Sequence, residues 1–212
     1  MGLIRSTFWT AFVLAMGLLT FLLFPLLRGK VLAGVGEALT YEDPLQRADV
    51  AAVTPETGIA GALESADLFR GRTVPRIAVL IPTPRDAEVE LARRGVRVDG
   101  QIDLLAKLGV PRHVIVEIPA GEGGTTDSTA ALAGWCRAHP VKRLLVIVSP
   151  DHGTRVRRAL ERAIGSRGPA VEIRNTRYDP FRAATWWQTR TTARDGIVEI
   201  EKLVLDYAMH PF

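Results

Sequence analysis

The sequence predicts an α/β protein, with a mostly parallel five-stranded sheet between two layers of helices, preceded by one N-terminal transmembrane helix. Three observations support this prediction: short runs rich in Val and Ile, apolar residues at helical spacing between those runs, and one long uncharged segment near the N-terminus. The rest of the 212-residue chain is of a size that forms one domain with its own core.

The uncharged segment comes first. Residues 6–27 read STFWTAFVLAMGLLTFLLFPLL, and at a rise of about 1.5 Å per residue a helix of this length crosses a hydrocarbon core of about 30 Å. We therefore expect a membrane-spanning helix over residues 7–27, which contacts the lipid bilayer. Trp9 would lie at one membrane interface, and Arg28 at the other.

The processing and the orientation of this segment stay open. Residues 31–33 carry small side chains at the spacing of a signal-peptidase site, but the apolar run is longer than usual for a signal peptide, and Arg28 and Lys30 follow it. Positive charge gives little guidance, because Arg5 and the N-terminal amine oppose those two residues. We expect an uncleaved anchor, with its short tail in the cytoplasm and the domain on the exported side.

After a linker over residues 31–47, a domain is expected over residues 48–212. Runs of strand length, rich in Val and Ile, occur at 48–53, 76–81, 113–118, 143–148 and 170–174. A segment with apolar residues at helical spacing precedes each of the last four runs. Such alternation predicts right-handed βαβ crossovers. Ile197, Ile200 and Leu203 have the same spacing, so we expect a final long helix packed on the sheet.

Composition and motifs exclude several classes of function. The net charge is +4 with scattered basic residues, which is not the footprint of a nucleic-acid-binding protein. Cys136 is the single cysteine and is interpreted as a packing residue. No zinc motif or serine-hydrolase elbow occurs, and no cofactor is indicated. The histidines are isolated from one another: His113, His139, His152 and His210.

The loop after the fourth expected strand is the best candidate for chemistry. It reads SPDHGTR over residues 149–155 and starts a helix, whose free backbone N–H groups and Arg155 could together bind an anion such as a phosphate or carboxylate. His152 could then donate or accept a proton near neutral pH. The alternative is that Ser149 or Asp151 caps the helix and His152 is a solvated loop residue.

The preceding loop, GEGGTTDS at 121–128, combines glycines with Thr125 and Asp127 before another helix. Its spacing matches neither a Walker A loop nor a dinucleotide fingerprint, and a flexible loop with a helix cap is the alternative. Ligands of open α/β sheets bind beyond the carboxyl ends of the strands, so the two loops are expected to share one crevice. The loops expected at these strand ends are 54–58, 82–86, 119–128, 149–155 and 177–180. His152 and Asp127 are the candidate catalytic residues of that site, and Ser149, Thr125 and Arg155 its candidate ligand-binding residues.

The order of motifs resembles a bacterial family that includes ElyC, SanA and YdcF, which are envelope-associated proteins with a Rossmann-like domain. The most specific match is SPDHGTR at 149–155, and GTTDS at 124–128 resembles a second family segment. The first expected strand and the segment LGVPRHVIVE at 108–117 are also similar to the corresponding segments of the family. Glu199 and Lys202 also match, which adds Glu199 to the candidate ligand-binding residues.

The resemblance implies a single-pass protein of the bacterial inner membrane that contributes to cell-envelope biogenesis or integrity. Its ligand would be an anionic small molecule, such as a phosphate-bearing or nucleotide-like envelope precursor. The family carries glycine-rich turns after its first two strands, where this chain has TPETG at 54–58 and IPTPR at 81–85. The loss of these turns leaves open a non-catalytic scaffold or partner-binding protein. The resemblance also permits an S-adenosylmethionine-binding protein, although no glycine-rich loop after the first strand supports it here.

Overall fold

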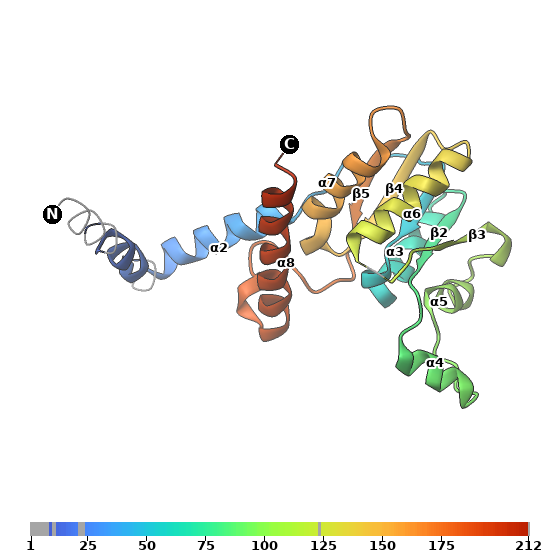
Figure 1. Cartoon of the computed structure of the whole chain (residues 1–212), viewed down its shortest axis with the longest axis horizontal. Helices are drawn as coiled ribbons and strands as arrows, with labels where there is room; N and C mark the ends of the chain where they lie inside the picture. The colour runs from blue at the N-terminus through green and yellow to red at the C-terminus, as the bar shows by residue number, and fades with distance from the viewer. Residues whose placement is uncertain (1–8, 10–11, 21–23, 123, 212) are drawn as a thin grey trace.

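The computed structural model describes residues 9, 12–20, 24–122 and 124–211. It contains a five-stranded sheet in which every strand pair is parallel and the order is β3-β2-β1-β4-β5 (Figure 1). The α/β class and the five expected strands are thus confirmed. The strands are β1 (Val50–Val53), β2 (Ile77–Ile81), β3 (Ile115–Pro119), β4 (Arg143–Val148) and β5 (Ala170–Asn175).

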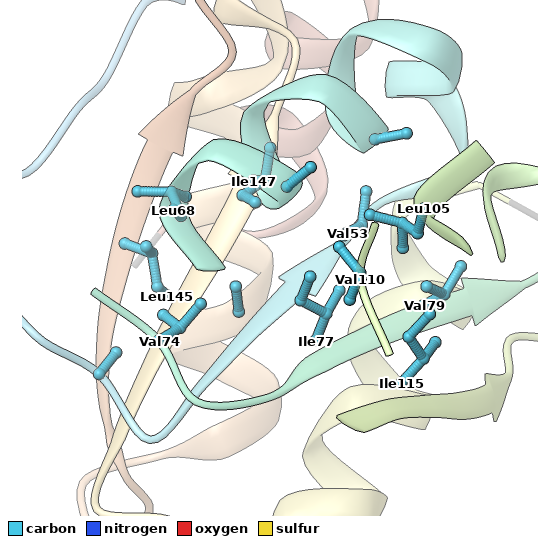
Figure 2. Close-up of a cluster of buried hydrophobic side chains, with 14 residues drawn as sticks. Val53, Leu68, Val74, Ile77, Val79, Leu105, Val110, Ile115, Leu145 and Ile147 are labelled. Carbon is cyan, nitrogen blue, oxygen red and sulfur yellow. The ribbon is translucent and has the colours of Figure 1, made fainter. Parts of the chain in front are cut away.

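Helices cover both faces of the sheet, as expected. On one face lie α3 (Gly58–Arg70) and α5 (Gln101–Lys107), and on the other α6 (Thr125–Ala138) and α7 (Gly153–Ile164). Successive side chains of β1 alternate between the two cores, and all of them are fully buried. Figure 2 shows the core on the α3 side. A sheet buried on both faces explains why its strands are continuous apolar runs rather than alternating ones.

The strand order places a topological switch point between β1 and β4. The chain proceeds from β1 to β2 and β3 on one side, and then returns to add β4 and β5 on the other side of β1. Two short 3-10 turns follow the strands at this point: η1 (Pro55–Thr57) after β1 and η3 (Pro150–His152) after β4. Such a switch point leaves a crevice beyond the strand ends, which is where α/β proteins bind ligands.

The segment that follows β2 contains a helix that the sequence interpretation missed. We expected a loop around residues 82–86, whereas α4 (Asp86–Arg93) begins there. Glu88 Oε2 accepts a hydrogen bond from the backbone N–H of Arg85 at 3.0 Å, which stabilises the first turn. None of the side chains of α4 is buried, and Figure 1 shows the helix projecting from the domain.

The N-terminal region differs from the expected linker. Helix α2 (Pro25–Leu39) covers the first half of residues 31–47, and Pro25 occupies its first turn, where proline is well tolerated. A Cβ atom on Gly36 would lie 2.3 Å from the carbonyl oxygen of Ala183, so the small residue permits close packing rather than flexibility. Trp186 Nε1 donates a hydrogen bond to the carbonyl of Leu32 at 2.8 Å.

The expected membrane-spanning helix at 7–27 lies partly outside the described residues. Residues 12–20 are helical, and Phe24 precedes the first turn of α2. Among the helices of the described residues, none has both the length and the apolar character that crossing a bilayer requires. The membrane span therefore stays a prediction.

The last helix, α8 (Arg190–Met209), follows the short turn η4 (Trp186–Gln188), and the Thr189 hydroxyl accepts a hydrogen bond from its first turn. We expected this helix on the sheet, but it packs elsewhere because other helices already cover both faces of the sheet. Leu203 joins a separate apolar cluster with Leu39 of α2, and Asp206 pairs with Arg158 of α7 at 2.8 Å.

The contact between the α2–β1 segment and α7 yields a stability prediction. A Cβ atom on Gly153 would lie 2.6 Å from the backbone oxygen and 2.7 Å from the backbone nitrogen of Tyr41. We expect Gly153→Ala to lower the free energy of unfolding by about 1–3 kcal/mol through overpacking, measured by thermal denaturation of the full chain.

The matched control is Gly134→Ala in α6. There the nearest atom is the far end of a flexible side chain at 3.7 Å, so alanine should be neutral or stabilising. Equal melting temperatures for the two variants would show that Tyr41 does not pack against Gly153.

Candidate functional site

The turns η1 and η3 bring two titratable side chains together at the switch point. Thr54 fixes η1 by donating its hydroxyl proton to the carbonyl of Ile147 at 2.9 Å, which ties the end of β1 to β4. A proline opens each turn directly after its strand, and this sets the backbone angle. As a result Glu56 of η1 faces His152 of η3.

His152 lies among three carboxyl groups. Its Nδ1 atom is 3.5 Å from Glu56 Oε1, and its Nε2 atom is 3.2 Å from Glu199 Oε2 and 3.7 Å from Asp151 Oδ2. The His152 side chain is 18 % exposed and that of Glu199 only 1 %. The imidazole therefore sits between a buried carboxylate behind it and Glu56, which is 31 % exposed.

Two buried atoms of this group retain unused hydrogen-bonding capacity. Within the described part of the chain, neither His152 Nδ1 nor Glu199 Oε2 has a partner in hydrogen-bonding geometry. Both residues line a cavity of about 450 Å³, together with Ser149 and Asp179. Buried polar atoms without partners are rare in folded proteins, and their presence beside a cavity is typical of a ligand-binding or catalytic site.

Glu199 is the centre of the charged network behind His152. Its Oε1 atom accepts a hydrogen bond from Arg155 Nε, and Lys202 Nζ lies 3.5 Å from its Oε2 atom. Arg155 also donates to the hydroxyl of Thr125 at the start of α6. The network therefore links α8, α7 and α6 around one buried carboxylate.

The surroundings shift the pKa values of the facing groups in opposite directions. Burial alone would lower the pKa of His152, but the adjacent Glu56 carboxylate and then the charges of Asp151 and Glu199 outweigh it and raise that pKa. Burial alone would raise the pKa of Glu56, but its contact with His152 outweighs burial and lowers it. An imidazolium facing a carboxylate is thus the favoured state of the pair.

The third carboxyl group behaves differently. Burial raises the pKa of Asp151 above its ordinary value, and the charges of Asp179 and Glu199 act in the same direction. The charge of His152 opposes this shift without cancelling it. Asp151 therefore holds a proton more readily than an ordinary aspartate.

The structure brings together five of the six expected site residues. Ser149 lies at the start of η3 and is buried, and Thr125, Arg155 and Glu199 are joined by hydrogen bonds. His152 completes the group. Asp127 is exposed on the first turn of α6, and its carboxylate lies beside Gly121 of its own loop rather than on the wall of the cavity.

The anion site that the sequence predicts at the start of α7 is occupied by the protein itself. The backbone of Tyr41 lies against Gly153, and Thr154 donates its hydroxyl proton to the carbonyl of Ala38 at 2.8 Å. Arg155 is engaged by Glu199 and Thr125. An anion at this point would have to displace these contacts.

The site residues chosen from the sequence do not include Glu56, Asp151 and Asp179, although each lies in one of the expected strand-end loops. Glu56 lies within the strand-tip loop at 54–58, which the sequence marks as a possible ligand loop. However, only the strand order shows that this loop faces η3. Asp179 lies in the segment after β5, where its Oδ1 atom accepts a hydrogen bond from the backbone N–H of Phe181 at 2.8 Å.

Over the residues that the structure describes, no group of three acidic, histidine or cysteine side chains has the geometry of a metal site. No family model matches the sequence, and no curated protein is significantly similar to it.

Proposed function

We propose that this chain is an enzyme that catalyses hydrolysis or group transfer by general acid–base chemistry, with His152 as the acid and Glu56 as the base. The observation that carries the proposal is the His152 ring, held among three carboxyl groups at the switch point with bonding capacity left beside a cavity. Groups whose surroundings move their pKa values apart are the usual acid and base of an active site.

Each residue then has a definite part. The Glu56 carboxylate takes a proton from an attacking water or hydroxyl group, and the His152 imidazolium gives a proton to the leaving group. Glu199 stabilises the imidazolium from behind, while Arg155 and Lys202 hold Glu199 in place. The pair is restored when the proton passes from Glu56 to His152, whose facing atoms are 3.5 Å apart.

The chain would act at the bacterial cell envelope, as its resemblance to the ElyC, SanA and YdcF family implies. Two features support this part of the proposal: the long apolar segment of the sequence, and the exposure of the apolar side chains described within it. Phe12, Val13, Leu14 and Leu18 are each at least half exposed. Exposed apolar residues in such number mark a surface for membrane or protein contact.

The charge of the cavity wall bears on the ligand. Five carboxyl side chains line the cavity against three basic ones, and two of those, Arg194 and Lys202, are largely exposed. A polar group that donates hydrogen bonds, such as a hydroxyl or an amine, fits this wall better than a phosphate. A phosphate-bearing precursor could bind with its anion at the rim, near Arg194 and Lys202.

Replacement of Glu56 tests the proposal. In cells that lack the gene, we expect Glu56→Gln at the normal level of expression to restore envelope integrity far less well than the wild type. The reason is that glutamine cannot accept the proton, which should cost about tenfold or more in rate. Survival in dilute detergent is the measurement. Glu37→Gln, an exposed change on α2, is the control, and equal restoration by both variants would refute the proposal.

A non-catalytic partner-binding protein is the second candidate. Two observations favour it. Arg155 already donates hydrogen bonds to Glu199 and Thr125, and the Tyr41 backbone lies against the start of α7, so the anion site expected of an enzyme of this family is filled by the protein itself. If Glu56→Gln and His152→Gln both restored the phenotype while crosslinking recovered a protein bound at the crevice, this second reading would replace the first.

A further inference from the structure

A second cavity, of about 620 Å³, opens between α4 and the ends of the strands. Its wall is mostly apolar and includes Val79 of β2, a member of the core cluster in Figure 2. On the other side it is lined by the apolar residues of α4 and of the segment after it: Val89, Leu91, Ala92, Val96 and Val98. The volume is typical of a site for a small organic ligand.

Helix α4 carries two apolar side chains that are only partly covered by the protein. Val89 is 38 % and Leu91 37 % exposed, although both belong to the wall of this cavity. An eight-residue helix that buries none of its side chains gains little stability from packing. An apolar ligand in the cavity would supply the contacts that α4 lacks.

The polar side chains at the cavity wall argue against a peptide as the occupant. Gln101 Nε2 donates to the carbonyls of Thr54 and Gly58 at 3.2 Å, Asp99 pairs with Lys107, and Glu88 bonds to the start of α4. These three side chains are already engaged within the protein, and the fourth polar side chain of the wall, Arg97, is exposed to solvent. A peptide backbone buried here would lose hydrogen bonds to water and regain few, whereas a hydrocarbon chain needs none.

The turn η1 lies between this cavity and the crevice. Pro55 lines the apolar cavity, and its neighbour Glu56 lines the polar one. A molecule that crosses η1 would therefore place an apolar part beneath α4 and a polar part beside His152. The two surfaces differ in chemistry but are contributed by consecutive residues.

We propose that the substrate of the His152 crevice is an amphiphile, whose aliphatic chain lies in the cavity beneath α4 and whose head group lies beside Glu56. The proposal rests on the proposed function for the identity of the reacting end. The acidic wall of the crevice selects a head group that is uncharged or cationic over a carboxylate.

Photolabelling of the full chain in phosphatidylcholine nanodiscs tests the proposal. The probes are octylamine, octyl glucoside and octanoate, each with a diazirine on the octyl chain, and labelled peptides are mapped by mass spectrometry. We expect residues 86–98 to be labelled about tenfold more by the amine and glucoside probes than by octanoate. In the double variant Val89→Gln, Leu91→Gln the labelling of residues 86–98 should fall about tenfold, because the contacts with the octyl chain of the probe are removed.

Two control variants make the readout specific. Both α4 residues are already partly exposed, so their replacement should leave the fold intact, and Ile197→Gln, an exposed apolar position on α8, should leave the labelling unchanged. In Glu56→Gln the preference for octylamine over octanoate should shrink, because the carboxylate that selects the head group is gone.

Three results would overturn the proposal. Labels confined to residues 1–39 would show that the probes enter only the bilayer. Equal labelling of 86–98 by all three probes, unchanged in Glu56→Gln, would show that the cavity is independent of the crevice. Displacement of the probes by an acetylated Val-Leu-Leu peptide but not by excess octyl glucoside would identify a peptide as the occupant. Each would leave the separate cell-based test of Glu56 unaffected.

Discussion

Glu199→Ala should lower the free energy of unfolding by about 3–5 kcal/mol, because it leaves Arg155 and His152 buried without their common carboxylate. For a chain of this length the melting temperature should fall by roughly 6–20 °C. Glu199 is 1 % exposed, so its ion pairs are only weakly screened by solvent. Thermal denaturation followed by circular dichroism is the measurement.

Two further variants separate the charge of Glu199 from its shape. Glu199→Gln keeps a hydrogen-bond acceptor at the same place and should lose less stability than alanine does. Glu201→Ala, an exposed glutamate on the same helix, should change stability by no more than about 0.5 kcal/mol. If Glu199→Ala were as stable as Glu201→Ala, the network around Glu199 would contribute nothing to the fold.

His152→Gln should abolish restoration of envelope integrity at the normal level of expression. Glutamine is of similar size and keeps polar atoms, but it cannot carry the proton, and removal of a general acid costs about 10²–10⁴ in rate. Detergent survival of cells that carry the variant is the measurement. The control is His113→Gln, an exposed histidine beside β3, which should behave as the wild type. Full restoration by His152→Gln at equal protein levels would exclude an acid–base role.

The pH dependence of stability provides a second readout for the same variant. The folded pKa of His152 lies above its ordinary value of 6.5, so the charged ring stabilises the fold most fully below that pH. This contribution is lost as the pH rises through the raised pKa. Relative to His152→Gln, the wild type should therefore lose stability between about pH 6 and pH 9. Denaturant unfolding at the two pH values measures the difference, and parallel curves would show that the pKa is not raised.

The sheet could be predicted from the sequence because burial on both faces leaves a strong local signal. The run RLLVIV at 143–148 contains only one polar residue, and the strand predicted there has the same first and last residues as β4. The helix α4 gave a weaker signal. None of its side chains is buried, and the prolines at 82 and 84 favour a loop. In α2 the glycines resemble a linker in composition, yet Gly36 serves close packing that only the position of Ala183 reveals.

The site was predictable where it depends on consecutive residues and unpredictable where it depends on strand order. Ser149, His152 and Arg155 fall on one loop, and their common location follows from the sequence. Glu56 is 96 positions away from His152 in the numbering of the chain and meets it only because β1 lies beside β4. Thr125 and Asp127 both lie on the first turn of α6, but Thr125 contacts Arg155 whereas the Asp127 carboxylate lies beside Gly121 of its own loop.

The packing of α2 determines how short a fragment of the chain can be and still keep the structure of this site. A fragment that began at residue 48, where the sequence places the domain boundary, would lack Leu39 from the cluster with Leu203 and Tyr41 from its contact with Gly153. It would also lack the Leu32 carbonyl that receives the Trp186 N–H. The first turn of α7, next to His152, would then be open to water. Helix α2 is therefore part of the folded unit that carries this site rather than a tether.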